Sequence, residues 1–216
     1  MIEGAIHWPG ILLAYAVITL GVISPGPAVM AIMGTALEKG RRPAVVLASG
    51  VVCGSAFWGI TAAAGLSVVL SQFGMALVAL KIIGGMYMLW LAWKSLRIAM
   101  NPVPLIPRAA THTDNRRMLL SGLLIHLTNP KGVFGWLATI SVGMTAGAPA
   151  WVAVVIVAGG VTISAIGHIG YAILFSTAKA ATIYTRMRRG IQLSLSAVFG
   201  AAGLSLLTTS FERTTP

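Results

Sequence analysis

Long apolar windows without a charged residue follow one another along the 216-residue chain, and short segments between them carry most of the charges. The first window, residues 11–37, is long enough for one membrane crossing, because a helix of ~20 residues spans a ~30 Å hydrocarbon core. Residues 43–80 and 132–178 are each too long for one crossing, so each window contains a turn. The pattern predicts an all-α integral membrane protein with six transmembrane helices, at about 11–37, 44–69, 75–96, 118–144, 151–176 and 190–211.

The composition agrees with a bilayer as the surrounding medium. Hydrophobic residues make up 57% of the chain and charged residues 9%, whereas about 25% of the residues of a soluble domain are charged. The net charge of +11 would suit a nucleic-acid partner, but the basic residues lie in short connections between apolar windows. We therefore expect contact with lipid and none with nucleic acid. The single cysteine, Cys53, excludes an intramolecular disulfide.

The basic residues also predict an orientation. Lys and Arg gather in the connections after the first, third and fifth predicted spans, and the turns after the second and fourth contain none. The positive-inside rule places the basic connections in the cytoplasm and both termini outside. Residues 1–10 contain no Lys or Arg, so we expect no cleaved signal peptide and a first span that stays in the mature protein.

The first and fourth predicted spans are interrupted at their centres. Ser24-Pro25-Gly26-Pro27 lies in the first span, and Asn129-Pro130-Lys131-Gly132 lies in the fourth. Proline removes a backbone donor and clashes with the preceding turn, so a helix breaks there and leaves peptide groups without partners. Such a break is tolerated in a bilayer where protein or water satisfies the backbone. A pair of broken spans in two halves is typical of a transporter's substrate site, and the alternative is two kinks that only shape the bundle.

The two halves are separated by the longest connection. Residues 97–117 are rich in proline and polar side chains, which indicates a flexible linker. We expect a first three-helix repeat at 1–100, a cytoplasmic linker at 101–117 and a second repeat at 118–216. Because three is odd, the two halves enter the membrane from opposite sides, as an inverted repeat requires.

Four ionisable side chains in the predicted spans are candidates for chemistry. Lys131 lies about 13 residues from either end of its span, beyond the reach of a snorkelling side chain, whereas Lys81 is close enough to an end to snorkel outward. His126 and His168 are the imidazoles of the spans and are our proton-coupling candidates. For each of these four side chains, the alternative to a functional role is a purely structural one. The acidic residues all lie outside the spans or at their rims, at Glu3, Glu38, Asp114 and Glu212.

Signals for an enzyme are missing from the sequence. It contains no HExxH, no CxxC, no phosphate-binding loop and no acidic pair, so we expect neither an enzyme nor a cofactor. Two histidines more than 40 residues apart make a poor metal site. The half-helix ends at the two breaks suit a small zwitterion instead, since free N–H groups attract an anion and free carbonyls attract a cation.

Three segments resemble one transporter family. SPGPAVMAIMGTALEKGRRPAVVLASGVVCG, LKIIGGMYMLWLAWKSLR and LTNPKGVFGWLATI are similar, in order and spacing, to segments of the lysine exporter and homoserine–threonine exporter (LysE/RhtB) family. The resemblance covers most of the chain. It implies export of amino acids or close derivatives across the bacterial inner (plasma) membrane, driven by the proton motive force, in six spans and often as a dimer.

The resemblance also implies a set of site residues. Besides Ser24, which flanks the first break, the matching positions are Pro25, Gly26, Pro27, Lys81, Asn129, Pro130 and Lys131. Some relatives carry an acid in the second or fifth span, where this chain has Ser55 and the Ser164–His168 segment. That difference favours a neutral rather than a basic amino acid as the substrate.

Two other classes of function stay open at this point. A metal or inorganic-ion exporter of similar architecture would require carboxylates or thiolates in the spans, and a non-transporting scaffold subunit would not require paired breaks. A chain of 22.4 kDa is small for a sealed alternating cavity, so a homodimer is also open.

Overall fold

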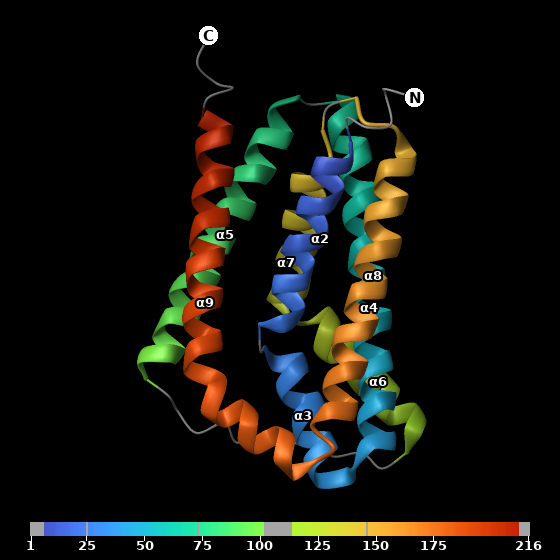
Figure 1. Ribbon diagram of the computed structural model, residues 1–216. Helices are drawn as coiled ribbons and strands as arrows, with labels where there is room; N and C mark the ends of the chain where they lie inside the picture. The colour runs from blue at the N-terminus through green and yellow to red at the C-terminus, as the bar shows by residue number, and fades with distance from the viewer. Residues whose placement is uncertain (1–6, 25, 73, 102–113, 146, 212–216) are drawn as a thin grey trace.

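The computed structural model of the protein describes residues 7–24, 26–72, 74–101, 114–145 and 147–211, and every regular element in them is an α-helix. In chain order the helices are α2 (Trp8–Ile23), α3 (Pro27–Lys39), α4 (Arg41–Gln72), α5 (Gly74–Met100), α6 (Asn115–Leu127), α7 (Pro130–Gly143), α8 (Ala150–Leu174) and α9 (Ala178–Phe211). They form an elongated bundle in which α5 and α9 stand as a pair beside the other helices (Figure 1).

Part of the bundle has clear membrane-spanning character. Within the described residues, the stretches Arg41–Gly65 and Ala150–Leu174 are each 25 residues long and apolar enough to cross a bilayer. The helices α2 and α3 meet the same criteria together, as one broken span bent by 48°. The protein is thus a helical membrane protein, and the full set of six spans stays a prediction.

One predicted loop is helical. The basic residues before the last predicted span, 190–211, were expected in a loop, but α9 begins at Ala178. Ala, Arg and Met are good helix formers, so a charged segment next to a membrane span can continue the helix. Figure 1 shows the result as a bend, in which the first part of α9 runs obliquely across one end of the bundle before the helix turns along it.

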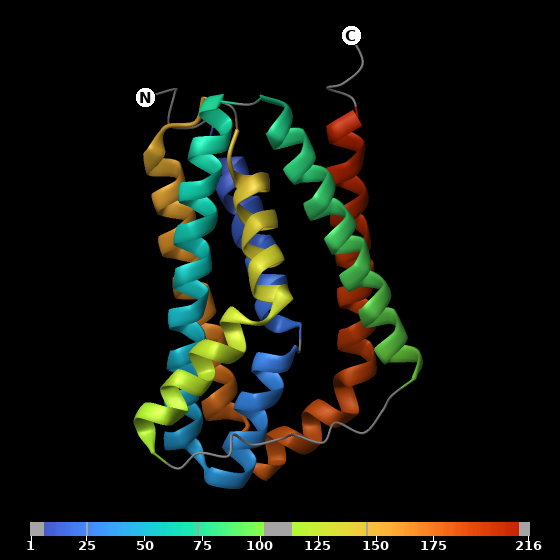
Figure 2. The same cartoon turned by 180° about the vertical axis from the view of Figure 1, so that it is seen from behind.

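The connections that carry the basic residues lie at one end of the bundle. The α3–α4 and α8–α9 junctions, the end of α5 and the start of α6 are all at the lower end of Figures 1 and 2, whereas α2 begins and α9 ends at the upper end. The α2–α3 pair therefore runs downward and the α6–α7 pair runs upward. Residues 102–113 of the predicted linker 101–117 lie outside the described residues, and α6 begins within the linker, at Asn115.

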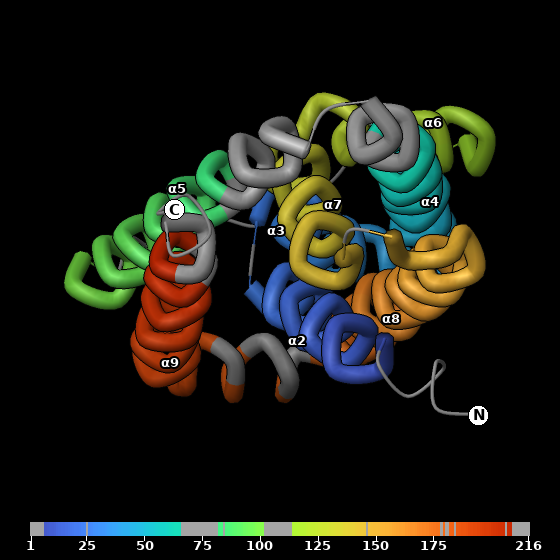
Figure 3. The backbone as a smooth tube through the Cα atoms, turned by 90° about the horizontal axis from the view of Figure 1, so that it is seen from above, coloured from blue at the N-terminus to red at the C-terminus, as the bar shows by residue number. Residues whose placement is uncertain are grey.

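The helix pairs at the centre bring the two breaks together. The helices α2 and α7 pack side by side along the middle of the bundle, with α4, α6 and α8 on one side and α5 with α9 on the other (Figure 3). Three apolar clusters surround them. They are centred on Ile32, Leu47 and Phe175, on Ile11, Trp136 and Ile156, and on Met88, Leu195 and Phe199.

Glycine permits a close contact between α4 and α6, and Gly50 and Gly54 of α4 have the GxxxG spacing that is typical of such contacts. A Cβ at Gly50 of α4 would overlap the carbonyl of Leu119 on α6, and a Cβ at Gly122 of α6 would overlap the carbonyl of Leu47 on α4. The two backbones touch, and the close approach fixes where His126, one turn beyond Gly122, enters the bundle.

Candidate functional site

The first break lies where the sequence predicts it. The helix α2 ends at Ile23, Ser24 follows in extended conformation with its side chain buried, and α3 restarts at Pro27. No side chain caps the start of α3 at Gly26. The first-turn N–H groups of α3 therefore have no side-chain cap, and the positive end of the helix dipole lies at this break. Pro25 lies outside the described residues.

The second break is capped by its own asparagine. The helix α6 ends at Leu127 and α7 restarts at Pro130, where Asn129 Oδ1 accepts a hydrogen bond of 3.1 Å from the backbone N–H of Lys131. The Asn129 side chain is buried, at 7% exposure. An asparagine in this position stabilises a helix start by about 1 kcal/mol. The start of α7 thus holds its own cap, unlike the start of α3.

Lys131 connects the two breaks. Its ammonium group donates to the backbone carbonyl of Ser24, the last residue before the first break. On the way its side chain passes Gly26, where a Cβ would lie 3.2 Å from Lys131 Cδ and 3.6 Å from Nζ. A second side chain holds the same helix end, since the Tyr171 hydroxyl of α8 donates to the Ile23 carbonyl at 2.8 Å. The carbonyls of Ile23 and Ser24, at the end of α2, are therefore both bound by side chains from the second half of the chain.

A cavity lies above Lys131, where the three apolar clusters meet. The space that the centre of a water molecule can reach in it has a volume of about 60 Å³. The cavity therefore has room for several waters or one small solute. We call it the central cavity. Its polar lining consists of Ser55, His126, Asn129, Lys131, Ser164 and His168. Its apolar lining includes Val17, Ile18, Met88, Leu91, Trp136 and Phe199.

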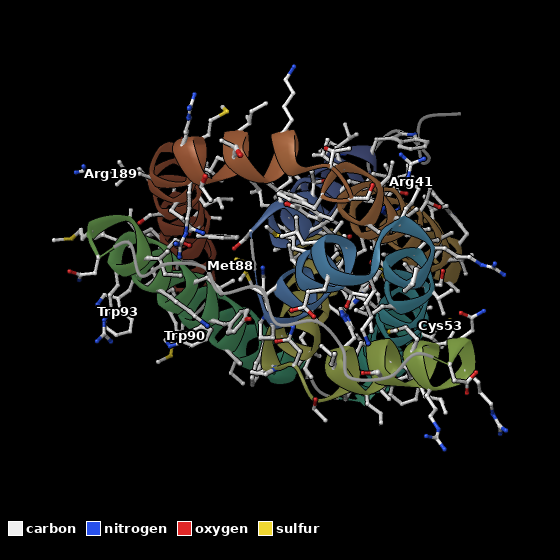
Figure 4. The ribbon with its side chains drawn as sticks, turned by 90° about the horizontal axis from the view of Figure 1, so that it is seen from below. Arg41, Cys53, Met88, Trp90, Trp93 and Arg189 are labelled. Atoms are coloured by element: carbon white, nitrogen blue, oxygen red, sulfur yellow. The ribbon has the colours of Figure 1, made fainter. Side chains whose placement is uncertain are left out.

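Figure 4 gives the view along the bundle from the end with the basic connections. Met88 lies on the side of α5 that faces the central helices, and Trp93 lies on the opposite side of the same helix. The exposed fractions of the two side chains agree with this placement, since they are 2% for Met88 and 56% for Trp93. One side of α5 therefore lines the cavity, and the opposite side is exposed.

The two predicted histidines meet in the central cavity. Their ring centroids are 6.1 Å apart, with the planes nearly perpendicular. His168 Nδ1 donates to the Ser164 carbonyl at 2.8 Å, a contact that fixes the proton on Nδ1 when the ring is neutral. Among the described residues, neither nitrogen of the buried His126 has a hydrogen-bond partner. A buried imidazole without partners is costly, so a water or a bound solute in the cavity would stabilise it.

Three polar groups of the site were not predicted as binding residues. Trp136 Nε1 donates to Ser55 Oγ at 3.0 Å, and both residues are buried. The ring of Trp136 also packs where a Cβ of Gly59 or of Gly160 would stand. Ser164 Oγ lies 3.2 Å from His168 Nδ1. The one signal in the sequence was that Ser55 and the Ser164–His168 segment stand where some relatives carry an acid.

The predicted site residues divide into three groups. Gly26, Asn129, Lys131, His126 and His168 line the central cavity together. Ser24, Pro27 and Pro130 line a second cavity that shares Lys131. Pro25 and the side chain of Lys81 lie outside the described residues, so their roles stay predictions. Among the described residues, no group of three His, Cys, Asp or Glu could hold a metal ion.

Comparison of the chain with known proteins places it in a family. The model of the LysE type translocators matches residues 19–210, which include both breaks and the whole polar lining of the central cavity. The chain belongs to the LysE type translocator family. It is accordingly a transport protein rather than an enzyme, as the absence of catalytic motifs predicts.

Relatives in this family come from several bacteria. The chain is 27% identical over 197 residues to the uncharacterized membrane protein YahN of Escherichia coli K12, covering 91% of this chain and 88% of that protein. It is 27% identical over 195 residues to the threonine efflux protein of Salmonella typhi, covering 87% and 92%. It is 30% identical over 115 residues to the homoserine/homoserine lactone efflux protein of Salmonella typhimurium, covering 53% and 55%. No solved structure matches the chain.

Proposed function

We propose that this translocator exports a small neutral amino acid, or a close derivative, from the cytoplasm across the bacterial inner membrane by proton antiport. The observation that carries the proposal is the central cavity, in which Lys131 and two histidines meet between two broken helices. Membership of the family and relatives named as threonine and homoserine efflux proteins support the choice of substrate class.

An inverted repeat accounts for the arrangement of the helices. We assign one three-helix repeat to residues 1–100 and the other to 118–216, joined by the linker 101–117. The α2–α3 pair runs opposite to the α6–α7 pair, α4 opposite to α8, and α5 opposite to α9 (Figures 1 and 2). The helices α4 and α5 pack against their counterparts α8 and α9, and the first half of one broken span, α2, packs against the second half of the other, α7. With the basic connections in the cytoplasm, the lower end of Figure 1 is the cytoplasmic end.

The substrate carboxylate has two partners in the central cavity. The start of α3 has no side-chain cap, and the buried first-turn residues Ala28 and Val29 line the cavity. A helix start binds an anion through its N–H groups and its dipole. Lys131 lies beside it, against Gly26, and supplies a positive charge that its bond to the neutral Ser24 carbonyl does not cancel. The carboxylate binds between the start of α3 and Lys131.

The substrate ammonium finds acceptors on the other wall. Ser55 and Ser164 line the cavity with hydroxyl oxygens, and a neutral His126 offers one lone pair. The cavity walls contain no carboxylate among the described residues. A substrate with an additional cationic side chain would therefore meet no counter-charge there, which favours a neutral amino acid.

His126 and His168 are the proton carriers of the proposed cycle. Imidazole has an ordinary pKa of about 6.5, nearer to neutrality than any other side chain of the cavity. The charged and titratable groups that face the pair are each other and Lys131. Because Lys131 repels a second positive charge, protonation of the pair and occupation by a zwitterion influence each other through the same space.

The test uses everted membrane vesicles, in which the cytoplasmic face points outward and export appears as uptake. Wild-type vesicles should accumulate radiolabelled threonine or homoserine when the interior is acidified. The His126→Gln/His168→Gln variant should lose this accumulation and keep downhill threonine exchange, since glutamine is polar and can form hydrogen bonds but does not titrate. Undiminished proton-driven accumulation in the double variant would remove both histidines from the coupling mechanism.

A further inference from the structure

A second cavity lies on the opposite side of Lys131 from the central cavity. It has a volume of about 80 Å³ by the same measure and is lined by Ser24, Asn129 and Lys131, together with Lys94 and Ser95 of α5 and Gln192 of α9. We call it the Gln192 cavity. The two cavities share Gly26, Leu91, Asn129 and Lys131, so the Lys131 side chain and the chain at the first break separate them.

Gln192 is the unusual residue of this cavity. Its side chain is 1% exposed, and within the described part of the chain its Oε1 has no hydrogen-bond partner. A buried amide oxygen without a donor destabilises the folded protein, and a donor that arrives with a ligand would account for its presence here. Buried Ser95, at 4% exposure, lies in the same lining.

Lys94 brings a positive charge to the same cavity. Its side chain is exposed, and its ammonium lies 4.9 Å from the ring centre of Trp90, which also lines the cavity. The aromatic face holds the ammonium without neutralising it. Among the described residues, the lining contains no acid to pair with Lys94. The cavity thus offers a fixed cation at an exposed position and an unused acceptor in the interior.

We propose that the Gln192 cavity is a separate binding site for the zwitterionic substrate on the cytoplasmic side of Lys131. Gln192 Oε1 accepts a hydrogen bond from the substrate ammonium, and Lys94 faces its carboxylate. The substrate moves on to the central cavity when Lys131 releases the Ser24 carbonyl, so Lys131 is the barrier between two sites. This inference rests on the proposed export function and on the proposed orientation.

The test compares transport from the two sides of the membrane, with L-threonine as the probe. In everted vesicles, Gln192→Met should raise the KM for threonine roughly tenfold and leave kcat unchanged, because it removes one charge-assisted hydrogen bond. In right-side-out vesicles, threonine exchange from the opposite side should keep the wild-type KM. Gln192→Glu retains an acceptor oxygen in either protonation state and should stay within about threefold of the wild-type KM.

Matched variants separate binding from folding. Ser194→Met changes an exposed residue two positions along α9 and should leave the KM on both sides unchanged. Lys94→Met should raise the cytoplasmic KM, whereas Arg97→Met, whose cation lies over Trp93 in the same helix outside the cavity, should not.

Two results would overturn the second site. One is an unchanged cytoplasmic KM in Gln192→Met, and the other is an equal loss from both sides of the membrane. A wild-type protein that transports neither threonine nor homoserine nor any other small neutral amino acid would instead overturn the proposed function, and this inference with it.

Discussion

Replacing Lys131 by methionine removes the group that connects the two breaks, and the structure indicates how the folded protein should respond. An ammonium near the centre of a bilayer is unfavourable by at least ~2.5–3.5 kcal/mol, and methionine relieves that cost. The Ser24 carbonyl loses its donor, which costs ~1–3 kcal/mol for a buried acceptor. The two effects nearly cancel, so Lys131→Met should insert, fold and keep its thermal midpoint in detergent within a few degrees.

Transport should change far more than stability. The carboxylate of the substrate loses a charged donor, and bonds of this kind contribute ~1.5–3 kcal/mol. Threonine uptake into everted vesicles should therefore require a ~10–100-fold higher concentration, or be lost within the accessible range. Lys179→Met is the matched control, because Lys179 is exposed at the start of α9 and lines neither cavity. Wild-type uptake by Lys131→Met, at equal protein in the membrane, would refute the assignment of the site.

Further predictions concern the contacts that hold the site in place. Gly50→Ala should lower the thermal midpoint, because its Cβ would overlap the Leu119 carbonyl and overpacking costs ~1–3 kcal/mol, whereas Gly65→Ala in the same helix meets open space and should not destabilise. Trp136→Phe should lower the free energy of unfolding by about 1 kcal/mol, because it removes a buried hydrogen bond. Trp58→Phe removes an Nε1 without a partner among the described residues and should cause no such loss. Equal thermal midpoints of the two glycine variants would contradict the close contact between α4 and α6. Equal free energies of unfolding of the two tryptophan variants would contradict the hydrogen bond from Trp136 to Ser55.

The breaks could be predicted from the sequence because proline acts locally. Pro27 and Pro130 each stand at the first position of a restarted helix, where the missing N–H is not required. Lys131 could be singled out from the sequence because it lies too far from either end of its predicted span to snorkel. The structure adds what its ammonium binds, the carbonyl of Ser24 at the other break. That contact joins residues far apart in sequence, so local patterns do not indicate it.

The faces of the helices could not be predicted in the same way. In a membrane protein, the side of a helix that faces lipid is as apolar as the side that faces its neighbours, so periodicity does not indicate which residues line a cavity. Gln192 and Tyr171 were missed for this reason. The start of α9 was misplaced because a run of basic residues was interpreted as a loop, although the same residues favour a helix.

Protection of a single thiol by substrate tests the central cavity most directly. The chain has one cysteine, Cys53, which is exposed on α4, so its replacement by serine gives a background without thiols. In that background, Ser164→Cys places one thiol on the wall of the central cavity. We predict that threonine slows the labelling of this thiol by a small methanethiosulfonate reagent, and that in the wild-type protein it leaves the labelling of Cys53 unchanged. Equal labelling rates with and without threonine, in a variant that still transports threonine, would contradict a binding site between the two breaks.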